Sequence, residues 1–296
     1  MKNPYLLLVL ATLFWAGNFI LSKAVSAEVP PIALAFWRWG MAFLLITVVS
    51  FSKFKRDWGL IKKHLPVLSL ISLFGVAAFN TLIYLGLQHT TALNSLLLQS
   101  FFPIVVALLS FVWMGEKLRA LQILGIVISL LGTLLLVAQG KLSTLLSAAF
   151  NQGDLWVMVA VFCYALYALL LRYRPPVHAF SFLIATFGLG TLMLLPFYLW
   201  EHQYVQKVHW QWNAIMTVAY LAVFPSLVSY LFFNEAVRKI GANTAGLFSH
   251  LVPLFGSIMA IVFLGEPFFR YHAIGAAFTF AGIYLVVANR SSKALK

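Results

Sequence analysis

The chain has 296 residues, of which 62% are hydrophobic and 9% are charged, and its net charge is +13. Soluble globular proteins contain about 45–50% apolar and about 25% charged residues, so this composition excludes a soluble domain. The lipid bilayer is therefore the expected surrounding of most of the chain. The single cysteine, Cys163, excludes an intramolecular disulfide and a metal site built from several cysteines.

Apolar segments follow one another from one end of the chain to the other. A helix of about 20 apolar residues spans the hydrocarbon core of a bilayer. We expect ten such helices, at residues 4–23, 31–51, 66–87, 93–113, 119–138, 153–171, 179–199, 212–233, 243–264 and 270–289. The first has a longer apolar run than the 7–15 residues, roughly, of a signal peptide, so we expect it to be retained as a span.

One long stretch of the chain occurs twice, since residues 84–139 match residues 234–289 without a gap. The match concentrates on proline and glycine, whose backbone roles no other residue fills. The matched positions are Pro103 and Pro253, Gly115-Glu116 and Gly265-Glu266, Gly125 and Gly275, and Gly132 and Gly282. The pattern indicates an internal duplication, with one five-helix repeat at residues 1–140 and the other at 151–290.

The distribution of lysine and arginine predicts the orientation. Most of them fall in connections on the side of the N-terminus, and Arg38 lies inside a predicted helix. The opposite side has only Lys23, Lys141, Lys207 and Arg270. Positive charge collects in cytoplasmic loops, so both termini are expected in the cytoplasm. The excess of basic residues is thus explained by the orientation of the helices in the membrane, and we expect no nucleic-acid partner.

Because each repeat has five spans, the second must enter the membrane from the opposite side to the first. The predicted fold is therefore an all-α integral membrane protein with ten transmembrane helices in two inverted five-helix repeats. Inverted repeats place a substrate site near mid-membrane, between halves that move to give alternating access. The sequence accordingly favours a transporter of a small-molecule substrate.

Several short motifs together resemble the EamA family of the drug/metabolite transporter superfamily. They are Phe14-Trp15-Ala16-Gly17-Asn18-Phe19, Phe36-Trp37-Arg38, the run 84–92, the mid-helix prolines and the two Gly-Glu pairs. The resemblance implies a ten-helix carrier without a cofactor, typically an exporter of amino acids or related small metabolites in the bacterial inner membrane. The second repeat departs from the first-helix motif, with Tyr164-Ala165-Leu166-Tyr167 in place of Trp15 to Asn18, as an asymmetric substrate would favour.

Two prolines are expected to break the fourth and ninth helices. Pro103 and Pro253 each remove the hydrogen bond to the carbonyl four residues earlier, in the polar pairs Gln99-Ser100 and Ser249-His250. In hydrocarbon a freed carbonyl is tolerated only against protein or a water-filled cavity. We expect these pairs to line a cavity, and the alternative is a packed structural kink.

An equivalent break is expected in the third and eighth helices, where Gly75 corresponds to Pro225. Polar residues accompany it at helical spacing in both repeats, namely Asn80 and Tyr84 in the first, and Ser226, Ser229, Tyr230 and Asn234 in the second. Residues three or four apart share a helix face, so each set can point into one cavity. Alternatively, they bond neighbouring helices.

Arg38 and His250 are the notable titratable residues inside predicted helices. An unpaired cation in the membrane is costly and is a functional candidate, and a guanidinium binds a carboxylate in a two-pronged way. The alternatives for Arg38 are bonds to carbonyls at a helix end, or snorkelling to the surface. His250 could exchange protons near neutral pH or serve as a neutral hydrogen-bond partner. All acidic residues fall in loops or near helix ends, so no carboxylate relay is expected.

Glycines at the same spacing in both repeats predict scaffold features. Gly125 with Gly132, and Gly275 with Gly282, each share a helix face, which allows close packing of the fifth and tenth helices as scaffold or as a homodimer contact. The pairs Gly115-Glu116 and Gly265-Glu266 are expected to end one helix and to place a carboxylate before the next, where the helix dipole favours it.

Together these patterns predict a substrate site between helices one to four and six to nine. The candidate substrate-binding residues are Trp15, Asn18, Arg38, Asn80, Tyr84, Gln99, Ser100, Tyr164, Tyr167, Tyr230, Asn234, Ser249 and His250, and the candidate hinges are Gly75, Pro103, Pro225 and Pro253. A nucleotide-sugar or lipid-linked-sugar carrier is the alternative, although a polyphosphate would favour more basic residues than Arg38. An enzyme acting on lipid would need a reactive constellation, and the scattered histidines form none, so no enzyme is expected.

Overall fold

Helices make up most of the chain in the computed structural model, which describes residues 3–141, 143, 150–264 and 267–294. Within these residues, nine helical stretches are long and apolar enough to cross a membrane. They coincide with the predicted segments, except that the eighth and ninth form one run, Trp212–Val262. The predicted all-helical membrane fold is confirmed, whereas the count of ten spans is not.

The elements of the first half begin and end close to the predicted bounds, except that the second helix continues beyond its predicted end at residue 51, after a kink at Ser50. They are α1 (Pro4–Ala24), α2 (Pro31–Lys63), α3 (Leu65–Ser72), the π-helix η1 (Leu73–Ala78), α4 (Phe79–His89), α5 (Ala92–Gln99), α6 (Phe102–Met114) and α7 (Ala120–Val137). The third and fourth predicted helices are therefore each built from shorter helices joined by a break.

The second half repeats this order of intact and broken helices. It contains α9 (Gln152–Leu170), the short 3-10 helix η2 (Leu171–Tyr173), α10 (Ala179–Tyr204), α11 (Trp212–Leu221), the π-helix η3 (Ala222–Val228), α12 (Ser229–Leu247), the 3-10 helix η4 (Phe248–His250), α13 (Leu251–Leu264) and α14 (Arg270–Ala294). Gly241 interrupts α12 with non-helical dihedral angles, φ 74° and ψ 161°.

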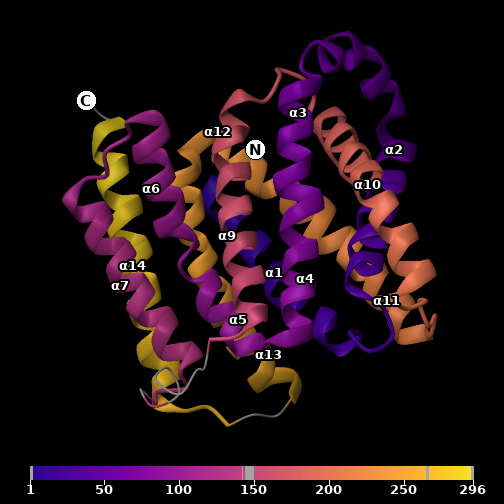
Figure 1. Cartoon of the computed structure of the whole chain (residues 1–296). Coiled ribbons are helices and arrows are strands. Elements are labelled where there is room, and N and C mark those ends of the chain that lie inside the picture. The colour runs from indigo at the N-terminus through magenta and orange to yellow at the C-terminus, as the bar shows by residue number, and fades with distance from the viewer. Residues whose placement is uncertain (1–2, 142, 144–149, 265–266, 295–296) are drawn as a thin grey trace.

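The main helix contacts join one half of the chain to the other. Helix α2 packs against α10 at one side of the molecule and α7 against α14 at the other, with α1, α4, α9, α12 and α13 between them (Figure 1). In the centre, α1 packs against α12, and α4 packs against α9. Neither half therefore forms a core of its own.

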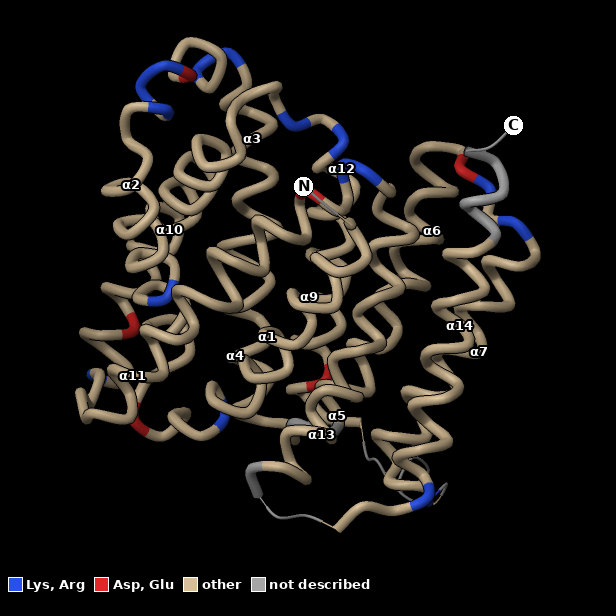
Figure 2. Tube along the Cα trace, turned by 180° about the vertical axis from the view of Figure 1, so that it is seen from behind, with Lys and Arg blue, Asp and Glu red and all other residues tan. Residues whose placement is uncertain are grey.

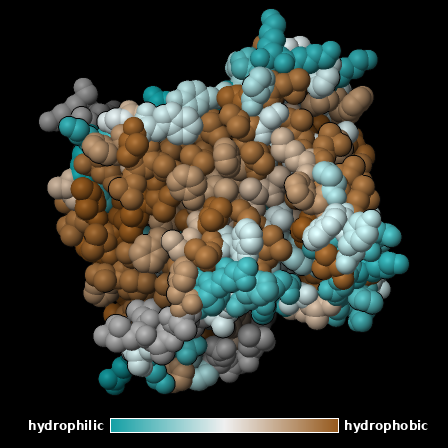
Figure 3. All heavy atoms as spheres, viewed as in Figure 1, coloured by the Kyte–Doolittle hydropathy of each residue, from teal (hydrophilic) through white to brown (hydrophobic). Residues whose placement is uncertain are grey.

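Apolar side chains cover the middle of the molecule and charged side chains its ends. Hydrophobic residues dominate the face in Figure 3, with hydrophilic residues gathered toward the upper and lower ends. Helix α2 kinks at Ser50, and the basic segment after it caps one end. Figure 2 shows most lysines and arginines at that end and few at the opposite one. Which end faces the cytoplasm stays a prediction.

The glycines of α7 and α14 bring the two backbones into direct contact. A Cβ atom on Gly125 would lie 2.6 Å from the carbonyl oxygen of Gly282, and one on Gly132 would lie 2.6 Å from that of Gly275. The predicted close packing of these helices is therefore confirmed, and the glycine faces contact each other within one chain.

The first Gly-Glu pair, Gly115-Glu116, matches the prediction at its glycine but not fully at its glutamate. Gly115 ends α6 in the left-handed conformation, at φ 66°, as expected. The carboxylate of Glu116, however, lies 2.7 Å from Nη1 of Arg172, so it forms an ion pair near η2 and does not serve only the dipole of the next helix. The second pair, Gly265-Glu266, lies outside the described residues.

We expect Gly132→Ala to destabilise the protein by about 1–3 kcal/mol, because the added methyl group meets backbone atoms of α14 that cannot move aside. The thermal unfolding midpoint of the purified protein in detergent measures this change. Gly256→Ala is the matched control, since a Cβ there meets no atom within 4 Å. Equal midpoints for the two variants would contradict the tight contact.

Candidate functional site

Arg38 lies at the centre of a buried hydrogen-bond network, with a relative exposure of only 1%. Its Nε donates to Ser226 Oγ at 2.6 Å. Its Nη1 lies 2.7 Å from Asn18 Oδ1, 2.8 Å from Asn80 Oδ1 and 2.6 Å from Tyr84 Oη. Arg38 is thus bonded to side chains from α1, α4 and η3, and it neither snorkels nor bonds helix-end carbonyls.

The partners of Arg38 are all neutral. Among the described residues, no carboxylate lies within ion-pair distance of its guanidinium, and Nη2 has no hydrogen-bond partner. A buried charge held only by neutral dipoles is costly unless it is paired. The network therefore leaves the N–H groups of Nη2 without an acceptor and the positive charge without a carboxylate, although the guanidinium carbon also lies 4.8 Å from the centre of the Trp39 ring.

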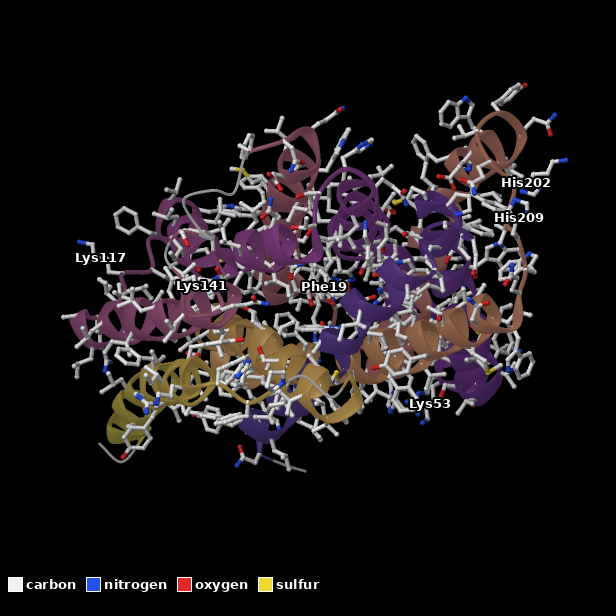
Figure 4. The ribbon with its side chains drawn as sticks, turned by 90° about the horizontal axis from the view of Figure 1, so that it is seen from below. Phe19, Lys53, Lys117, Lys141, His202 and His209 are labelled. Carbon is white, nitrogen blue, oxygen red and sulfur yellow. The ribbon has the colours of Figure 1, made fainter. Side chains whose placement is uncertain are left out.

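Arg38 borders a small cavity between the two halves of the chain. The cavity has a volume of about 30 Å³, room for one or two water molecules and too little for an amino acid. Eight of the predicted site residues line it: Trp15, Asn18, Arg38, Asn80, Gln99, Tyr164, Tyr230 and Ser249. Phe19, another lining residue, lies near the middle of the molecule when it is viewed from one end, while Lys53 and Lys117 lie toward its edges (Figure 4).

Two polar groups on the cavity wall have no partner. Gln99 Nε2 and Ser249 Oγ are buried and form no hydrogen bond with the described residues. Leaving such a group unsatisfied costs about 1–3 kcal/mol, so each is available to water or a ligand. Together with Arg38 Nη2, they place polar groups from α2, α5 and η4 around one space.

Aromatic rings form the rest of the wall. The ring of Tyr164 stacks on Phe79 with centroids 4.3 Å apart, and it meets Trp15 edge-on at 5.8 Å. Phe102 lies 5.3 Å from Tyr164 and also lines the cavity. Such tilted and offset contacts are favourable for aromatic pairs. The cavity therefore has a cationic, polar part and an aromatic, apolar part.

Sequence reasoning missed the apolar lining residues, which are Phe19, Phe79, Ile83, Phe102, Val161 and Val252. Nothing in their type separates them from the many apolar residues that face lipid. Ser226, by contrast, carried a signal, because it lies four residues before Tyr230 beside the predicted break. That spacing places it on the cavity face of the helix.

Tyr167 and Asn234 form a separate pair outside the cavity lining. Tyr167 Oη donates to Asn234 Oδ1. In the first half, Tyr84 Oη donates to Asn18 Oδ1 at 2.9 Å. Tyr84 corresponds to Asn234, and Asn18 to Tyr167, so the same bond between equivalent helices occurs twice with the two residue types exchanged.

Gly75 and Pro225, the predicted breaks, each lie in a π-helix, η1 and η3. A side chain from the other half bonds the backbone at each. Tyr230 Oη donates to the Gly75 carbonyl at 2.5 Å, and Trp15 Nε1 donates to the Pro225 carbonyl at 3.1 Å. Irregular backbone inside a membrane requires such partners, and here the two halves supply them to each other.

Ser100 and His250 also contact each other and do not line the cavity. They flank the proline breaks, since α6 begins with Phe102-Pro103, and Pro253 lies in the first turn of α13. His250 Nε2 lies 2.8 Å from the Ser100 carbonyl oxygen, and Nδ1 lies 2.8 Å from Ser129 Oγ. A carbonyl only accepts, so Nε2 carries a proton. The imidazole thus joins η4 to α7 and to the break before α6.

These features define the class of the protein as a multi-pass helical membrane protein with a polar cavity buried between its halves. The chain belongs to the EamA-like transporter family, whose model matches residues 2–138 and again residues 151–288. It is therefore a transporter of the drug/metabolite superfamily, as its motifs predict.

Relatives that cover most of the chain are named as transporters or exporters. An "Uncharacterized transporter" of Archaeoglobus fulgidus is 32% identical over 297 residues, covering 98% of this chain and 99% of the relative. "Uncharacterized transporter YyaM" of Bacillus subtilis is 27% identical over 284 residues, covering 95% and 92%. A "Probable terminal-alkyne amino-acid exporter" of Streptantibioticus cattleyicolor is 25% identical over 227 residues, covering 76% and 73%.

A solved crystal structure has the same fold. It superposes with a TM-score of 0.75 at 19% identity and covers 97% of this chain and 98% of its own. At this identity the likeness concerns the fold alone.

We expect Ser226→Ala to lower the free energy of unfolding by about 1–3 kcal/mol, because Arg38 Nε would lose its partner while remaining buried. Thermal unfolding in detergent measures the loss. Ser95→Ala is the matched control, since Ser95 is buried and its hydroxyl has no partner, so its removal should be neutral or stabilising. A Ser226→Ala midpoint no lower than that of Ser95→Ala would refute the role of this hydrogen bond.

Proposed function

We propose that the protein exports amino acids or related small carboxylates across the bacterial inner membrane by alternating access, with Arg38 as the residue that binds the substrate carboxylate. One observation carries this assignment. Arg38 is buried without a carboxylate partner, and its unbonded Nη2 belongs to a residue on the cavity wall. A carboxylate would supply the missing counter-charge and accept from the free N–H groups of Nη2, since Nε and Nη1 already have partners.

The proposal includes two inverted five-helix repeats, at 1–140 and 151–290, with both termini in the cytoplasm. The exchanged pairs Asn18 with Tyr84 and Tyr167 with Asn234 support the repeats, as do the two matches of the family model. The run Trp212–Val262 has 51 residues. At about 1.5 Å per residue it is more than twice the thickness of a hydrocarbon core of about 30 Å, so we assign it two spans that meet at Gly241.

Alternating access is supported by the closed state of the cavity. A space of about 30 Å³ cannot admit an amino acid, so the halves must separate before a substrate binds. The bonds from Trp15 to Pro225 and from Tyr230 to Gly75 cross between the halves and are among those that this separation would break. Gly75, Pro103, Pro225 and Pro253 remain our candidate hinges.

The choice of substrate is supported by the site and by one relative. The cavity lining contains one cation, Arg38, whereas a polyphosphate headgroup would favour several, which weighs against a nucleotide-sugar or lipid-linked-sugar carrier. The relative named as an amino-acid exporter favours the amino-acid assignment. The aromatic wall suits an apolar or aromatic side chain. A homodimer stays a further expectation.

Amino acids should raise the thermal unfolding midpoint of the purified protein, and Arg38→Ala should lose this response. A ligand at a hundredfold excess over its Kd stabilises by about 2.7 kcal/mol. Arg38→Lys serves as the matched variant, since it keeps the positive charge but loses the planar guanidinium. It should retain a weaker stabilisation by amino acids. The compounds tested should include amino acids, amino-acid derivatives and sugar phosphates. Stabilisation by phosphorylated compounds alone would favour the sugar carrier.

Orientation can be tested with single cysteines in a Cys163→Ala background. We expect an impermeant maleimide added to intact cells to label Lys207→Cys, and to label Lys55→Cys only after the cells are permeabilised. Both side chains are exposed. Lys55 belongs to the segment of α2 after Ser50 and Lys207 to the connection from α10 to α11, and these two segments lie at opposite ends of the molecule (Figure 1). The reverse pattern of labelling would place the termini outside the cytoplasm.

A further inference from the structure

A second, much larger cavity opens at the end of the molecule that carries most of the basic residues. It has a volume of about 690 Å³ and lies between the C-terminal end of α6, the segment after α9, and α12. Its charged lining residues are Glu116, Arg172, Arg174, Arg238 and Lys239. The hydrogen bond from His178 N–H to Asp57 Oδ2, at 2.9 Å, joins the segment after α9 to the basic segment that follows Ser50.

Most of these cations are already paired. Arg172 Nη1 lies 2.7 Å from Glu116 Oε1. Arg238 Nη2 and Lys239 Nζ lie 2.5 Å and 3.5 Å from the same oxygen, Glu235 Oε1. These three cations share only two carboxylates, so they carry a net positive charge. The third arginine of the lining, Arg174, adds to it.

Arg174 is the remaining arginine, and it differs from the others in having no carboxylate partner. Among the described residues its side chain forms no hydrogen bond and no ion pair, and its guanidinium carbon lies 5.7 Å from the centre of the Phe182 ring. Burial and the nearby charge of Arg238 lower the pKa of the Arg174 guanidinium. A bound anion would offset both effects, because its opposite charge favours the charged guanidinium.

Arg174 also lies close to the hydrogen-bonded pair of Tyr167 and Asn234. It shares a smaller pocket with Asn234, whose Oδ1 accepts from Tyr167 and whose Nδ2 is buried without a partner. Tyr167 precedes Arg174 by seven residues, and the end of α9 and the 3-10 helix η2 lie between them. The ring of Tyr167 stacks on Tyr164, which lines the cavity of Arg38. A continuous line of polar and aromatic side chains therefore joins the two arginines.

We infer that this basic vestibule is a first docking site for small carboxylates, with Arg174 as its donor and the Tyr167–Asn234 pair as the closure between it and the cavity of Arg38. The inference rests on the proposed function, because it treats the docked carboxylate as substrate on its way to Arg38. A guanidinium suits a carboxylate because its planar donors match both oxygens. The vestibule is large enough for an amino acid, whereas the inner cavity is not.

The test uses a cysteine in the vestibule wall as a reporter. Cys163→Ala removes the buried native thiol, and Ala242→Cys places a thiol on a half-buried lining position, with Met114→Cys as a second reporter if the first does not fold. The rates of modification by an anionic and a cationic methanethiosulfonate are measured on the full-length protein in detergent. A unit charge about 7 Å away in a water-like dielectric changes the local concentration of a charged reagent about threefold.

Acetate is the carboxylate probe. We expect the anionic reagent to modify the reporter cysteine faster than the cationic one does. We also expect acetate to slow the reaction of the anionic reagent more than chloride does at equal ionic strength. Arg174→Gln should lower the rate of the anionic reagent about threefold and abolish the difference between acetate and chloride. Arg172→Gln removes the same charge from the same vestibule, but its guanidinium is already paired, so the protection by acetate should remain.

The outcomes separate the docking site from the proposed function. Equal effects of acetate and chloride in the wild type, or loss of protection in Arg172→Gln but not in Arg174→Gln, would overturn the docking site. Neither result would affect a stabilisation by amino acids that depends on Arg38. Protection by acetate that depends on Arg174, without any stabilisation by amino acids, would support carboxylate docking and count against the amino-acid assignment.

Discussion

The rest of the structure depends on how one buried cation is held. Arg38 is surrounded by neutral oxygens that belong to α1, α4 and η3, so its charge is shared between elements of both halves of the chain. Each of these dipoles lowers the cost of burial, but none removes the charge. The arrangement joins the two halves and leaves Nη2 without a partner, and our proposal of a carboxylate site depends on that combination.

The helix breaks also join the two halves of the chain. A π-helix or a proline leaves backbone groups that lipid cannot satisfy, so each break must lie against protein. In this chain the partners come from the other half: Tyr230 bonds the carbonyl of Gly75, Trp15 that of Pro225, and His250 that of Ser100. The irregular backbone therefore joins the halves at the level of the cavity, where a moving carrier would have to part them.

The sequence predicted most of the polar residues around the cavity, but not which of them line it and which bond each other beside it. The residues beside the breaks converge on Arg38 because helical spacing puts them on one face, as for Asn80 and Tyr84. Tyr167 with Asn234, and Ser100 with His250, lie at the predicted depth but bond each other. Their separation from the cavity depends on which helices touch, and spacing along one helix carries no information about that contact.

By itself, the sequence determined the membrane class, the approximate spans and the family. Hydropathy, proline and glycine act locally along the chain, so their pattern can be read from neighbouring residues. Only the tertiary structure decided the partners of Arg38, the size of the closed cavity and the unpaired state of Arg174. Ser226 lies 188 residues from Arg38, and a contact over such a distance follows from the packing of helices, not from any local pattern.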